Sequence, residues 1–348
     1  MNKVKVNHIK KAIEEDIVRN ISILETDELS KDCLIVKPAN KWIEEAKKRP
    51  IPNMLFSELW YEGELSILYA DTNVGKSILA VQIGESVSSG IPIDSFKLEA
   101  KAQRVLYLDF ELSDKQFEKR YSNEFTNHYQ FHPNFFRAEI NPLAKIPKDF
   151  KNMEEYLCSQ LGTLIVKYQA EVVIVDNLTF LNNDSEKAKY ALELMKQLKR
   201  ITKECHTSIL VLAHTPKRDE SKPISMNDLA GSKMLINFCD SAFALGFSQH
   251  EPSHRYIKQI KQRNTEHIYH VNNVIICCLE KQQNFLQFRF LYYDSEINHL
   301  RNPSKTDLEE RDDQMKGMIQ EGMSNVKIGE ALGISEAAVR KRRKILGI

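Results

Sequence analysis

The sequence lacks the features of an exported, membrane-bound or metal-clustered protein. Its six cysteines include no Cys-x-x-Cys pair, and Cys277 and Cys278 are adjacent in an apolar run, so a structural zinc site and a disulfide framework are disfavoured. No apolar run approaches the roughly 20 residues that a membrane helix needs. Residues 1–20 also lack the apolar stretch of a secretory signal. We therefore expect a cytoplasmic protein without a membrane partner.

The chain also lacks an excess of charge of either sign. Its 49 basic and 48 acidic residues leave a formal net charge of +1, so bulk charge does not draw it to nucleic acid or to an anionic membrane. Any basic binding surface must be local. With 348 residues, 42% hydrophobic and 28% charged, the chain is typical of a globular protein with two domains or one domain and an appendage.

Short apolar runs alternate with longer amphipathic stretches over residues 60–213, and this alternation predicts crossover units around a parallel sheet. After residue 241 four strand-like runs follow one another without helices, so we expect them to extend the sheet by antiparallel pairing. The predicted fold class is α/β, with a mainly parallel central sheet and a small all-α domain. The expected parts are a helical arm and linker over 1–50, an α/β domain over 51–295, a linker over 296–306 and a helical domain over 307–348.

The segment from Ala70 to Ser77 carries the strongest chemical signal. It matches the phosphate-binding pattern G-x-x-x-x-G-K-[ST] except at the first position, where Ala70 replaces glycine. In this pattern backbone N–H groups and a helix N-terminus bind polyphosphate, Gly75 admits the backbone close to the ligand, and Lys76 reaches the outer phosphates. The Ser77 hydroxyl would ligate Mg²⁺. We assign ATP and Mg²⁺ as cofactors, with nucleotide contacts from Asp71, Thr72, Asn73, Val74, Gly75, Lys76, Ser77 and Ile78; an ordinary strand-turn-helix is the alternative.

Acidic residues end two other predicted strands. Asp176 closes four apolar residues in the form of a Walker B strand, where it would face the phosphate loop and hold Mg²⁺ through water. The next residue is Asn177 rather than Glu, so the candidate base that orients the attacking water is Glu111. Asp109 competes for this role from the same strand face. A charged residue that merely opens the next loop is the remaining interpretation of Glu111.

These residues, together with His214 at the end of the 208–214 run, resemble the RecA-like ATPases, and within them the RepA-type and DnaB-type hexameric helicases. The resemblance covers about residues 55–280 and includes Ala230-Gly231-Ser232 and the strand end that contains Lys261 and Arg263.

The resemblance implies a role for each matching residue. Glu111 would activate water and His214 would sense the γ-phosphate. Lys261 and Arg263 would enter a neighbouring subunit's site as finger residues, and such cations are worth roughly 10³–10⁵ in rate. With Lys76, these four residues form the predicted catalytic set, and a homo-oligomer, expected to be a hexameric ring, is implied. The alternatives are a capped strand end for His214 and a solvated strand face for Lys261 and Arg263.

The connection over 215–231 faces the central channel in RecA-like motors, so the resemblance implies contacts between single-stranded DNA and Lys217 and Arg218. Lys222 is a further candidate. Asp219 and Glu220 are interleaved with these cations, and an ordinary surface loop is the alternative.

The C-terminal residues predict a second DNA-binding element. Apolar residues follow helix-turn-helix spacing around Gly333 at the turn, and Ser335 is placed to cap a basic second helix. This looks like a resolvase-type or sigma-type helix-turn-helix, with a protein-interaction module as the alternative. The candidate contacts to duplex DNA are Glu336, Ala337 and Arg340 on bases, and Lys341, Arg343 and Lys344 on phosphates.

Taken together, the sequence predicts an ATP-hydrolysing oligomeric motor on DNA, by resemblance a replicative or mobilisation helicase of a plasmid or mobile element. The alternative is a regulatory DNA-binding switch in which ATP controls assembly without unwinding. A recombinase filament is disfavoured because the sequence shows no aromatic-rich strand-exchange element.

Overall fold

The computed structural model describes residues 34–141, 143–150, 153–177, 187–216, 218–229, 233–302 and 305–348. The chain divides into two compact units, Met1–Ile51 and Pro52–Ile348. In the first unit, helix α2 (Ala39–Ala46) exposes Trp42 and Ile43, and Lys37 forms an ion pair with Glu45 at 2.9 Å. Within the described residues of the expected N-terminal arm and linker, the helix covers Ala39–Ala46, and residues 1–33 lie outside the described residues.

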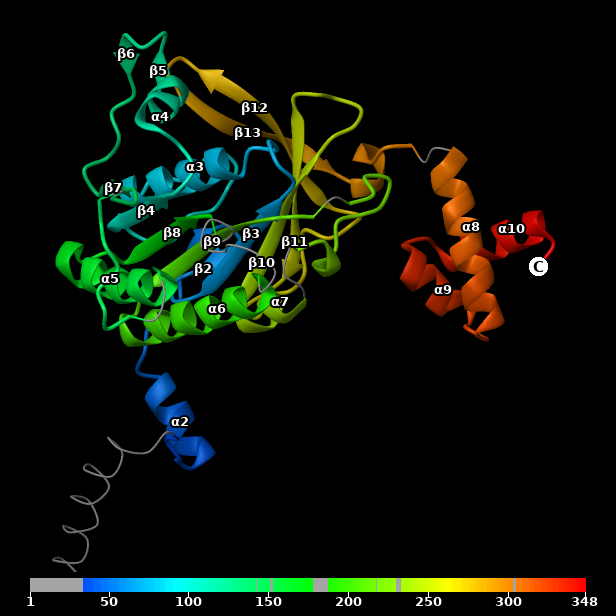
Figure 1. Cartoon of the computed structure of the whole chain (residues 1–348), viewed down its shortest axis with the longest axis horizontal. Helices are drawn as coiled ribbons and strands as arrows, with labels where there is room; N and C mark the ends of the chain where they lie inside the picture. Colours follow the sequence, from blue (N-terminus) through cyan, green and yellow to red (C-terminus); the bar gives the residue numbers. More distant parts are fainter. Residues whose placement is uncertain are drawn as a thin grey trace, which may run out of the picture. The chain divides into compact units, whose positions relative to one another are not determined.

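A nine-stranded sheet forms the centre of the second unit within the described residues (Figure 1). Its order is β13-β12-β11-β10-β3-β9-β8-β4-β7. The strands from β10 to β7 pair in parallel, and β11, β12 and β13 extend the sheet by antiparallel pairing. The bounds are β3 (Leu65–Ala70), β4 (Val105–Asp109), β7 (Phe135–Ala138), β8 (Val172–Asp176), β9 (Ser208–His214), β10 (Ser241–Phe247), β11 (His254–Lys261), β12 (Val274–Gln282) and β13 (Phe285–Asp294).

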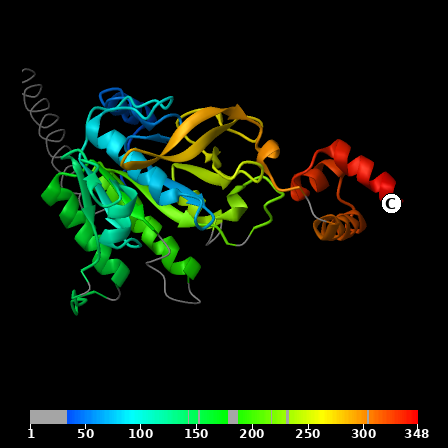
Figure 2. The same cartoon turned by 90° about the horizontal axis from the view of Figure 1, so that it is seen from above.

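Helices cover both faces of this sheet (Figures 1 and 2). Helix α3 packs on one face, and α5, α6 and α7 pack on the other. None of the described helices is both long enough and apolar enough to cross a membrane. The helices are α3 (Lys76–Ser89), α4 (Asp114–Arg120), α5 (Met153–Tyr168), α6 (Lys187–Glu204) and α7 (Lys233–Phe238); the short elements are β1 (Met54–Phe56), β2 (Trp60–Tyr61), β5 (Ser122–Asn123), β6 (Asn127–His128), η2 (Met226–Asp228) and η3 (Glu296–His299).

The central strands are apolar on both faces because both faces are buried. Along β3, Leu65, Ile67 and Tyr69 pack on the side of α5, α6 and α7, whereas Leu68 and Ala70 pack on the side of α3. A strand covered on both sides reads as a continuous apolar run rather than as an alternation. The predicted mainly parallel α/β sheet is therefore confirmed.

Three expectations need correction. The strand β7 and the helix α5 were not predicted, although Cys158, Leu161 and Ile165 recur at helical spacing along α5 and are buried. The strand β10 pairs in parallel with β3 rather than antiparallel. Helix α7 lies between β9 and β10 and brings the chain back to the end of the sheet at which β3 begins. The expected linker over 296–306 begins inside the core: Glu296 is buried and accepts hydrogen bonds from Lys258 Nζ at 2.5 Å and Ile224 N at 2.6 Å.

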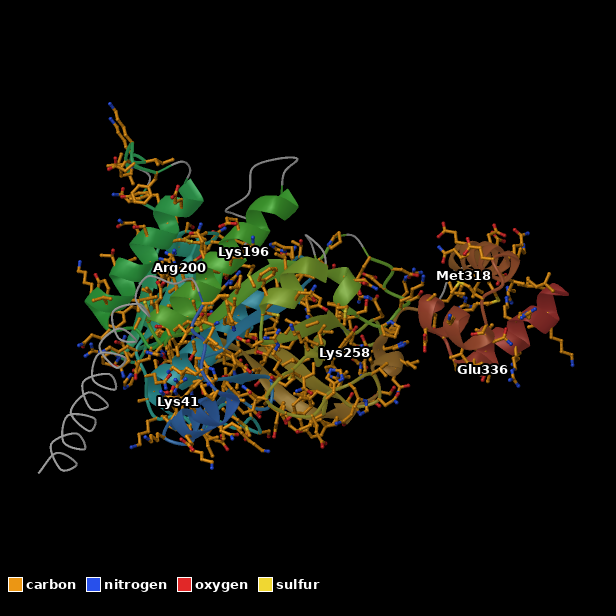
Figure 3. The ribbon with its side chains drawn as sticks, turned by 90° about the horizontal axis from the view of Figure 1, so that it is seen from below. Lys41, Lys196, Arg200, Lys258, Met318 and Glu336 are labelled. Atoms are coloured by element: carbon orange, nitrogen blue, oxygen red, sulfur yellow. The ribbon has the colours of Figure 1, made fainter. Side chains whose placement is uncertain are left out.

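Three C-terminal helices share a small core of their own. They are α8 (Lys305–Gln320), α9 (Asn325–Leu332) and α10 (Glu336–Leu346), and their buried residues are Met315, Ile328, Leu332 and Val339. Gly333 ends α9 in the left-handed conformation with φ 66°, and the Ser335 hydroxyl accepts a hydrogen bond from Ala338 N at 3.1 Å. The predicted turn and cap are thus confirmed. Figure 3 labels Met318 on α8 and Glu336 at the start of α10.

The contact between Gly246 on β10 and Tyr256 on β11 gives a test of the packing. The two residues are cross-strand partners, and a Cβ on Gly246 would lie 2.1 Å from Tyr256 Cζ. We expect Gly246→Ala to lower the free energy of unfolding by roughly 1–3 kcal/mol through overpacking. In the control Gly162→Ala, the new Cβ meets nothing within 4 Å on helix α5, and a gain of about 0.5–1 kcal/mol is expected. Urea denaturation measures both; equal midpoints for Gly246→Ala and the unmodified chain would contradict this packing.

Candidate active site

The carboxyl ends of four neighbouring parallel strands form the candidate site. Lys76 follows β3, His214 ends β9, Asp176 ends β8, and Glu111 follows β4 by two residues. These residues are far apart in sequence, and the strand order β3-β9-β8-β4 places them at one edge of the sheet. In open α/β sheets, ligands bind at this edge.

The loop between β3 and α3 is fixed from two sides. Gly75 has φ 112°, a conformation that favours glycine, and a Cβ there would lie 2.8 Å from Phe288 Cζ on β13. On the other side, Arg255 Nε on β11 donates a hydrogen bond to Val74 O at 3.0 Å. The antiparallel extension of the sheet therefore helps to shape the phosphate loop.

Lys76 folds back over this loop. Its ammonium donates hydrogen bonds to Ala70 O and Asp71 O, both at 2.9 Å, and lies 3.1 Å from His214 Nδ1. Burial lowers the pKa of Lys76 to about 8, although nearby carboxylates oppose the shift. The nearby carboxylates thus do not fully compensate for the burial of the Lys76 ammonium, and a bound phosphate would supply further negative charge beside it.

Asp176 has the surroundings of a magnesium position. Its carboxylate is buried and accepts hydrogen bonds from Tyr107 OH at 2.5 Å and from the Ser77 hydroxyl. Burial raises the pKa of Asp176 to about 6, against the effect of those hydrogen bonds. A hydroxyl and a carboxylate side by side are oxygen ligands of the kind that Mg²⁺ takes, so these residues fit the cation.

Glu111, His214 and Asn177 contact one another above the strand ends. His214 Nε2 lies 3.3 Å from Glu111 Oε1, and the Asn177 amide donates to the same carboxylate oxygen. Because an ammonium can only donate, His214 Nδ1 accepts from Lys76. His214 Nε2 lies 2.9 Å from Asn177 Nδ2 and also hydrogen-bonds with Glu111. This hydrogen bond lowers the pKa of Glu111, which favours an ionised carboxylate able to accept a proton from water. Asn177 was not predicted to take part; its place directly after Asp176 is the sequence signal for it.

The competing carboxylate, Asp109, is fully engaged elsewhere. It is buried, and its two oxygens accept hydrogen bonds from Leu112 N and from Arg137 Nε, each at 2.9 Å. Asp109 therefore braces the turn after β4. Of these two carboxylates, Glu111 lines the hollow beside the phosphate loop and Asp109 does not.

A hollow of about 180 Å³ lies between the phosphate loop and Glu111. Asp71 does not line it, because its carboxylate accepts hydrogen bonds from Thr215 and Arg218, and Val74 is buried beneath the loop. Arg120 was not predicted, since no motif marks it. The residues that line the hollow are Thr72, Asn73, Gly75, Lys76, Ser77, Ile78, Glu111, Arg120 and His214.

The predicted DNA contacts of the core are only partly accessible. Lys217 lies outside the described residues. Arg218 is not the exposed cation that was expected: its side chain is 7% exposed, and its Nε lies 3.2 Å from Asp71 Oδ2. It also donates a hydrogen bond to Lys222 O at 2.9 Å. Arg218 thus links the phosphate loop to the connection over 215–231 that follows β9. This contact agrees with the alternative that the connection is an ordinary surface loop.

Lys261 and Arg263 lie at the opposite edge of the sheet from the phosphate loop, because Lys261 pairs with Ala242 at the start of β10. Lys261 Nζ donates to Ile236 O at 2.5 Å and to Cys239 O at 2.7 Å. Arg263 is 53% exposed and forms an ion pair with Asp240 at 3.2 Å. Neither lines the hollow of its own chain, and Arg263 is the more accessible of the two.

The basic side chains of α10 differ in their contacts. Arg342 donates to both oxygens of Asp312 on α8, at 2.7 and 2.5 Å, and so joins the helices. Arg343 donates to Asn325 at 2.8 Å and Arg340 to Glu336 at 2.7 Å. The exposed members of the predicted set are Ala337, Arg340, Lys341 and Lys344.

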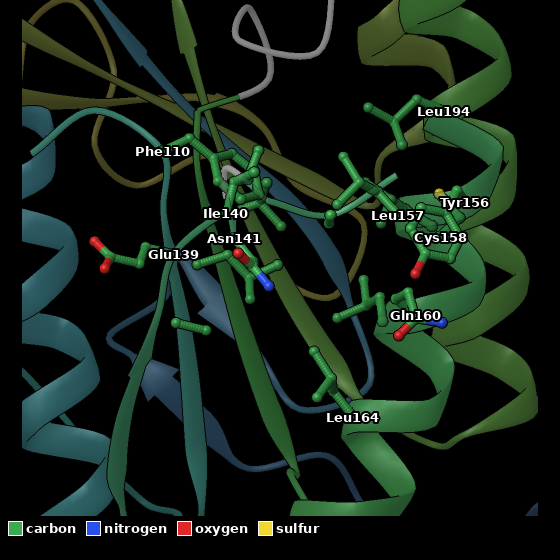
Figure 4. Close-up of a pocket in the computed structure, with 16 residues that line it drawn as sticks. Phe110, Glu139, Ile140, Asn141, Tyr156, Leu157, Cys158, Gln160, Leu164 and Leu194 are labelled. Carbon is green, nitrogen blue, oxygen red and sulfur yellow. The ribbon is translucent and has the colours of Figure 1, made fainter. Parts of the chain in front are cut away.

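A second cavity, of about 330 Å³, lies between the ends of β4 and β8 and the helices α5 and α6 (Figure 4). Its lining is mostly apolar and includes Leu108, Val175 and Leu194, with Glu139 and Asn141 at one side. None of the predicted catalytic residues lines it. Of the predicted catalytic residues, Lys76, Glu111 and His214 line the smaller hollow instead.

One comparison with known proteins bears on this site. A family model described as an AAA domain matches residues 36–220. The matched range includes the phosphate loop, Glu111, Asp176 and His214, and spans more than half of the chain. No curated protein matches the chain.

The lowered pKa of Lys76 predicts proton uptake on nucleotide binding. At pH 9 and without nucleotide, the Lys76 side chain is mostly in its neutral amine form, because burial lowers its pKa to about 8. A bound phosphate raises the pKa of Lys76 again, so nucleotide binding should be accompanied by uptake of about 1 proton at pH 9 and of a much smaller fraction at pH 7.5. Calorimetry of MgATP binding in two buffers of different ionisation enthalpy measures this number. Identical uptake at the two pH values would show that the pKa of Lys76 is not lowered.

Proposed function

Since this chain belongs to the AAA domain family of P-loop ATPases, we propose that it is an ATP-hydrolysing, RecA-like oligomeric motor that acts on DNA. The contact of His214 with both Lys76 and Glu111 carries the proposal. It joins the cation that binds the phosphates to the carboxylate that orients water. A phosphate-binding loop that only binds a nucleotide would not need a carboxylate such as Glu111 connected to it.

Each residue at the site has a chemical task. Lys76 exchanges its backbone acceptors for phosphate oxygens, and Ser77 and Asp176 are the residues that would hold Mg²⁺. When bound, Mg²⁺ neutralises negative charge on the β- and γ-phosphate oxygens. Glu111 accepts a hydrogen bond from the attacking water, and contacts with His214 and the Asn177 amide keep that carboxylate in place.

The oligomer supplies the remaining cation. Arg263 lies at the edge of the sheet opposite its own phosphate loop, and its guanidinium is half-exposed. Both features suit a finger residue that enters a neighbouring subunit's site. Lys261 is less suited, because carbonyl groups of its own chain hold its ammonium. A hexameric ring follows from the resemblance to RepA-type and DnaB-type helicases.

The C-terminal helices would bind duplex DNA as a helix-turn-helix domain. Their separate core, the capped helix α10 and the exposed cations Arg340, Lys341 and Lys344 support this role. One observation favours the second candidate, a regulatory switch: the burial of Arg218 removes a predicted core contact to single-stranded DNA. A forked-DNA unwinding assay separates the two, because the motor requires ATP-dependent strand separation and the switch does not.

Mixing two inactive variants tests the shared site. We expect Arg263→Ala to bind MgATP normally but to lose roughly 10³-fold or more in turnover, because the finger stabilises transition-state charge. Glu111→Gln should likewise bind without turnover. A mixture should regain activity, since some interfaces then combine an intact Glu111 with an intact Arg263. Full turnover of Arg263→Ala alone would refute the finger role.

Charge removal on α10 tests the duplex-binding role. We expect the double variant Lys341→Gln/Lys344→Gln to weaken duplex DNA binding and to reduce the slope of log K against log[salt] by about 2, because two phosphate contacts are lost. The matched control is Lys316→Gln/Lys327→Gln on α8 and α9. Fluorescence anisotropy over a salt series measures the slope, and ATP turnover without DNA should be unchanged in both variants. Equal slopes in the two double variants would contradict the assignment to α10.

A further inference from the structure

The phenol of Tyr107 holds the carboxylate of Asp176 from within the sheet. Its hydroxyl donates a hydrogen bond to Asp176 Oδ2 at 2.5 Å, and the Tyr107 side chain is fully buried. A phenol keeps its proton at neutral pH, so it is the donor when the carboxylate is ionised. Tyr107 does not line the phosphate hollow, yet it contacts the carboxylate that would hold Mg²⁺ there.

The register of the sheet explains how the two groups meet. Strands β4 and β8 pair in parallel, with Tyr107 opposite Ile174 and Asp109 opposite Asp176. Side chains two residues apart on a strand share a face, so Ile174 and Asp176 lie on the same face of β8. Tyr107 and Ile174 both pack in the core on the side of α3. Two residues of strand span about 6.6 Å, roughly the length of a tyrosine side chain, so the hydroxyl reaches Asp176 on the face where Ser77 begins α3.

The ring of Tyr107 is fixed by packing, and its hydroxyl is thereby fixed as well. The ring stacks on that of Phe135 in β7, with centroids 6.0 Å apart and planes at 26°. Phenylalanine would fill the same place in this apolar core without a polar atom. A buried hydroxyl costs free energy unless it has a hydrogen-bond partner, and Asp176 is a partner of this one. The hydroxyl therefore indicates a role at Asp176 rather than in the packing of the core.

We propose that Tyr107 is a positioning residue for Mg²⁺: it holds Oδ2 of Asp176 and so fixes the orientation in which that carboxylate meets the cation. This inference rests on the proposed ATPase function and adds to it a residue outside the phosphate hollow. Groups that hydrogen-bond to a metal ligand orient that ligand, and their loss typically weakens metal binding by roughly 10- to 100-fold. Ser77 contacts the same carboxylate, so the two hydroxyls together restrict its orientation.

Calorimetry of nucleotide binding with and without Mg²⁺ tests this role on the whole chain. The ligand is the non-hydrolysable β,γ-imido analogue of ATP, titrated once with EDTA and once with saturating Mg²⁺. The ratio of the two affinities is the gain that Mg²⁺ confers. We expect Tyr107→Phe to lower this gain roughly 10-fold, while the affinity in EDTA changes less than about twofold, because only the metal ligand has lost its hydrogen bond.

The matched control is Tyr69→Phe on the neighbouring part of the sheet. Tyr69 in β3 is also fully buried, and its hydroxyl donates to Ser225 O at 2.7 Å. It packs on the side of α5, α6 and α7, away from α3. Both variants should melt at a lower temperature without ligand, since each loses a buried hydrogen bond. Only Tyr107→Phe should lose part of the gain from Mg²⁺.

A double variant shows whether Tyr107 acts through Asp176. We expect Asp176→Asn to lose most of the gain from Mg²⁺, because it removes the charged oxygen ligand. Adding Tyr107→Phe to Asp176→Asn should then cause little further loss, since no carboxylate is left to position. Turnover gives a second readout: Tyr107→Phe alone should need more Mg²⁺ for half-maximal ATP hydrolysis, and saturating Mg²⁺ should restore its rate. Fully additive losses in the double variant would overturn the proposal.

The remaining outcomes are also decisive. An unchanged gain from Mg²⁺ in Tyr107→Phe would refute the inference while leaving the proposed ATPase intact. Equal losses in Tyr107→Phe and Tyr69→Phe would assign the effect to weaker packing of the sheet, and equal weakening with and without Mg²⁺ would assign it to the phosphate loop; either result overturns the role at the cation. Failure of the unmodified chain to bind the analogue under both conditions would instead overturn the proposed function, and this inference with it.

Discussion

Parallel hydrogen bonding among β3, β9, β8 and β4 is the constraint on which the rest of the structure depends. It aligns the carboxyl ends of these strands, so the residues that follow them meet at one edge although they are distant in the sequence. Both faces of the strands are covered by helices, which leaves that edge as the place where polar groups can meet a ligand. The phosphate loop, Asp176, Glu111 and His214 all take their positions from this single register.

Two charged groups at the site, Lys76 and Asp176, are less stable in their charged forms than they would be in water. Burial shifts Lys76 toward its neutral form and Asp176 toward its protonated form. Both charged forms are therefore less favoured in the protein than they are in water. A polyphosphate beside Lys76 and a divalent cation beside Asp176 would favour the charged forms together. A bound nucleotide and a bound metal would thus support one another through opposite pKa shifts at Lys76 and Asp176.

The antiparallel extension of the sheet, β11 to β13, helps to shape the site. Arg255 on β11 holds the carbonyl of Val74, and Phe288 on β13 packs against Gly75. On the opposite side, Arg218 ties Asp71 to the connection after β9. The loop is thereby fixed by segments from three parts of the chain, and its shape does not depend on the glycine-lysine pattern alone.

The sequence by itself determined the elements whose signal is local. The phosphate loop, the strand that ends at Asp176, the cap at Ser335 and the turn at Gly333 each follow from a few adjacent residues and were predicted. Only the tertiary structure decided which groups are free to act, because partners distant in sequence occupy the others. Within the described part of the chain, Asp109 pairs with Arg137, Arg218 is buried in an ion pair with Asp71, and Glu296 is buried in the core. Pairing and burial are properties of residues brought together by the fold, and no local pattern records them.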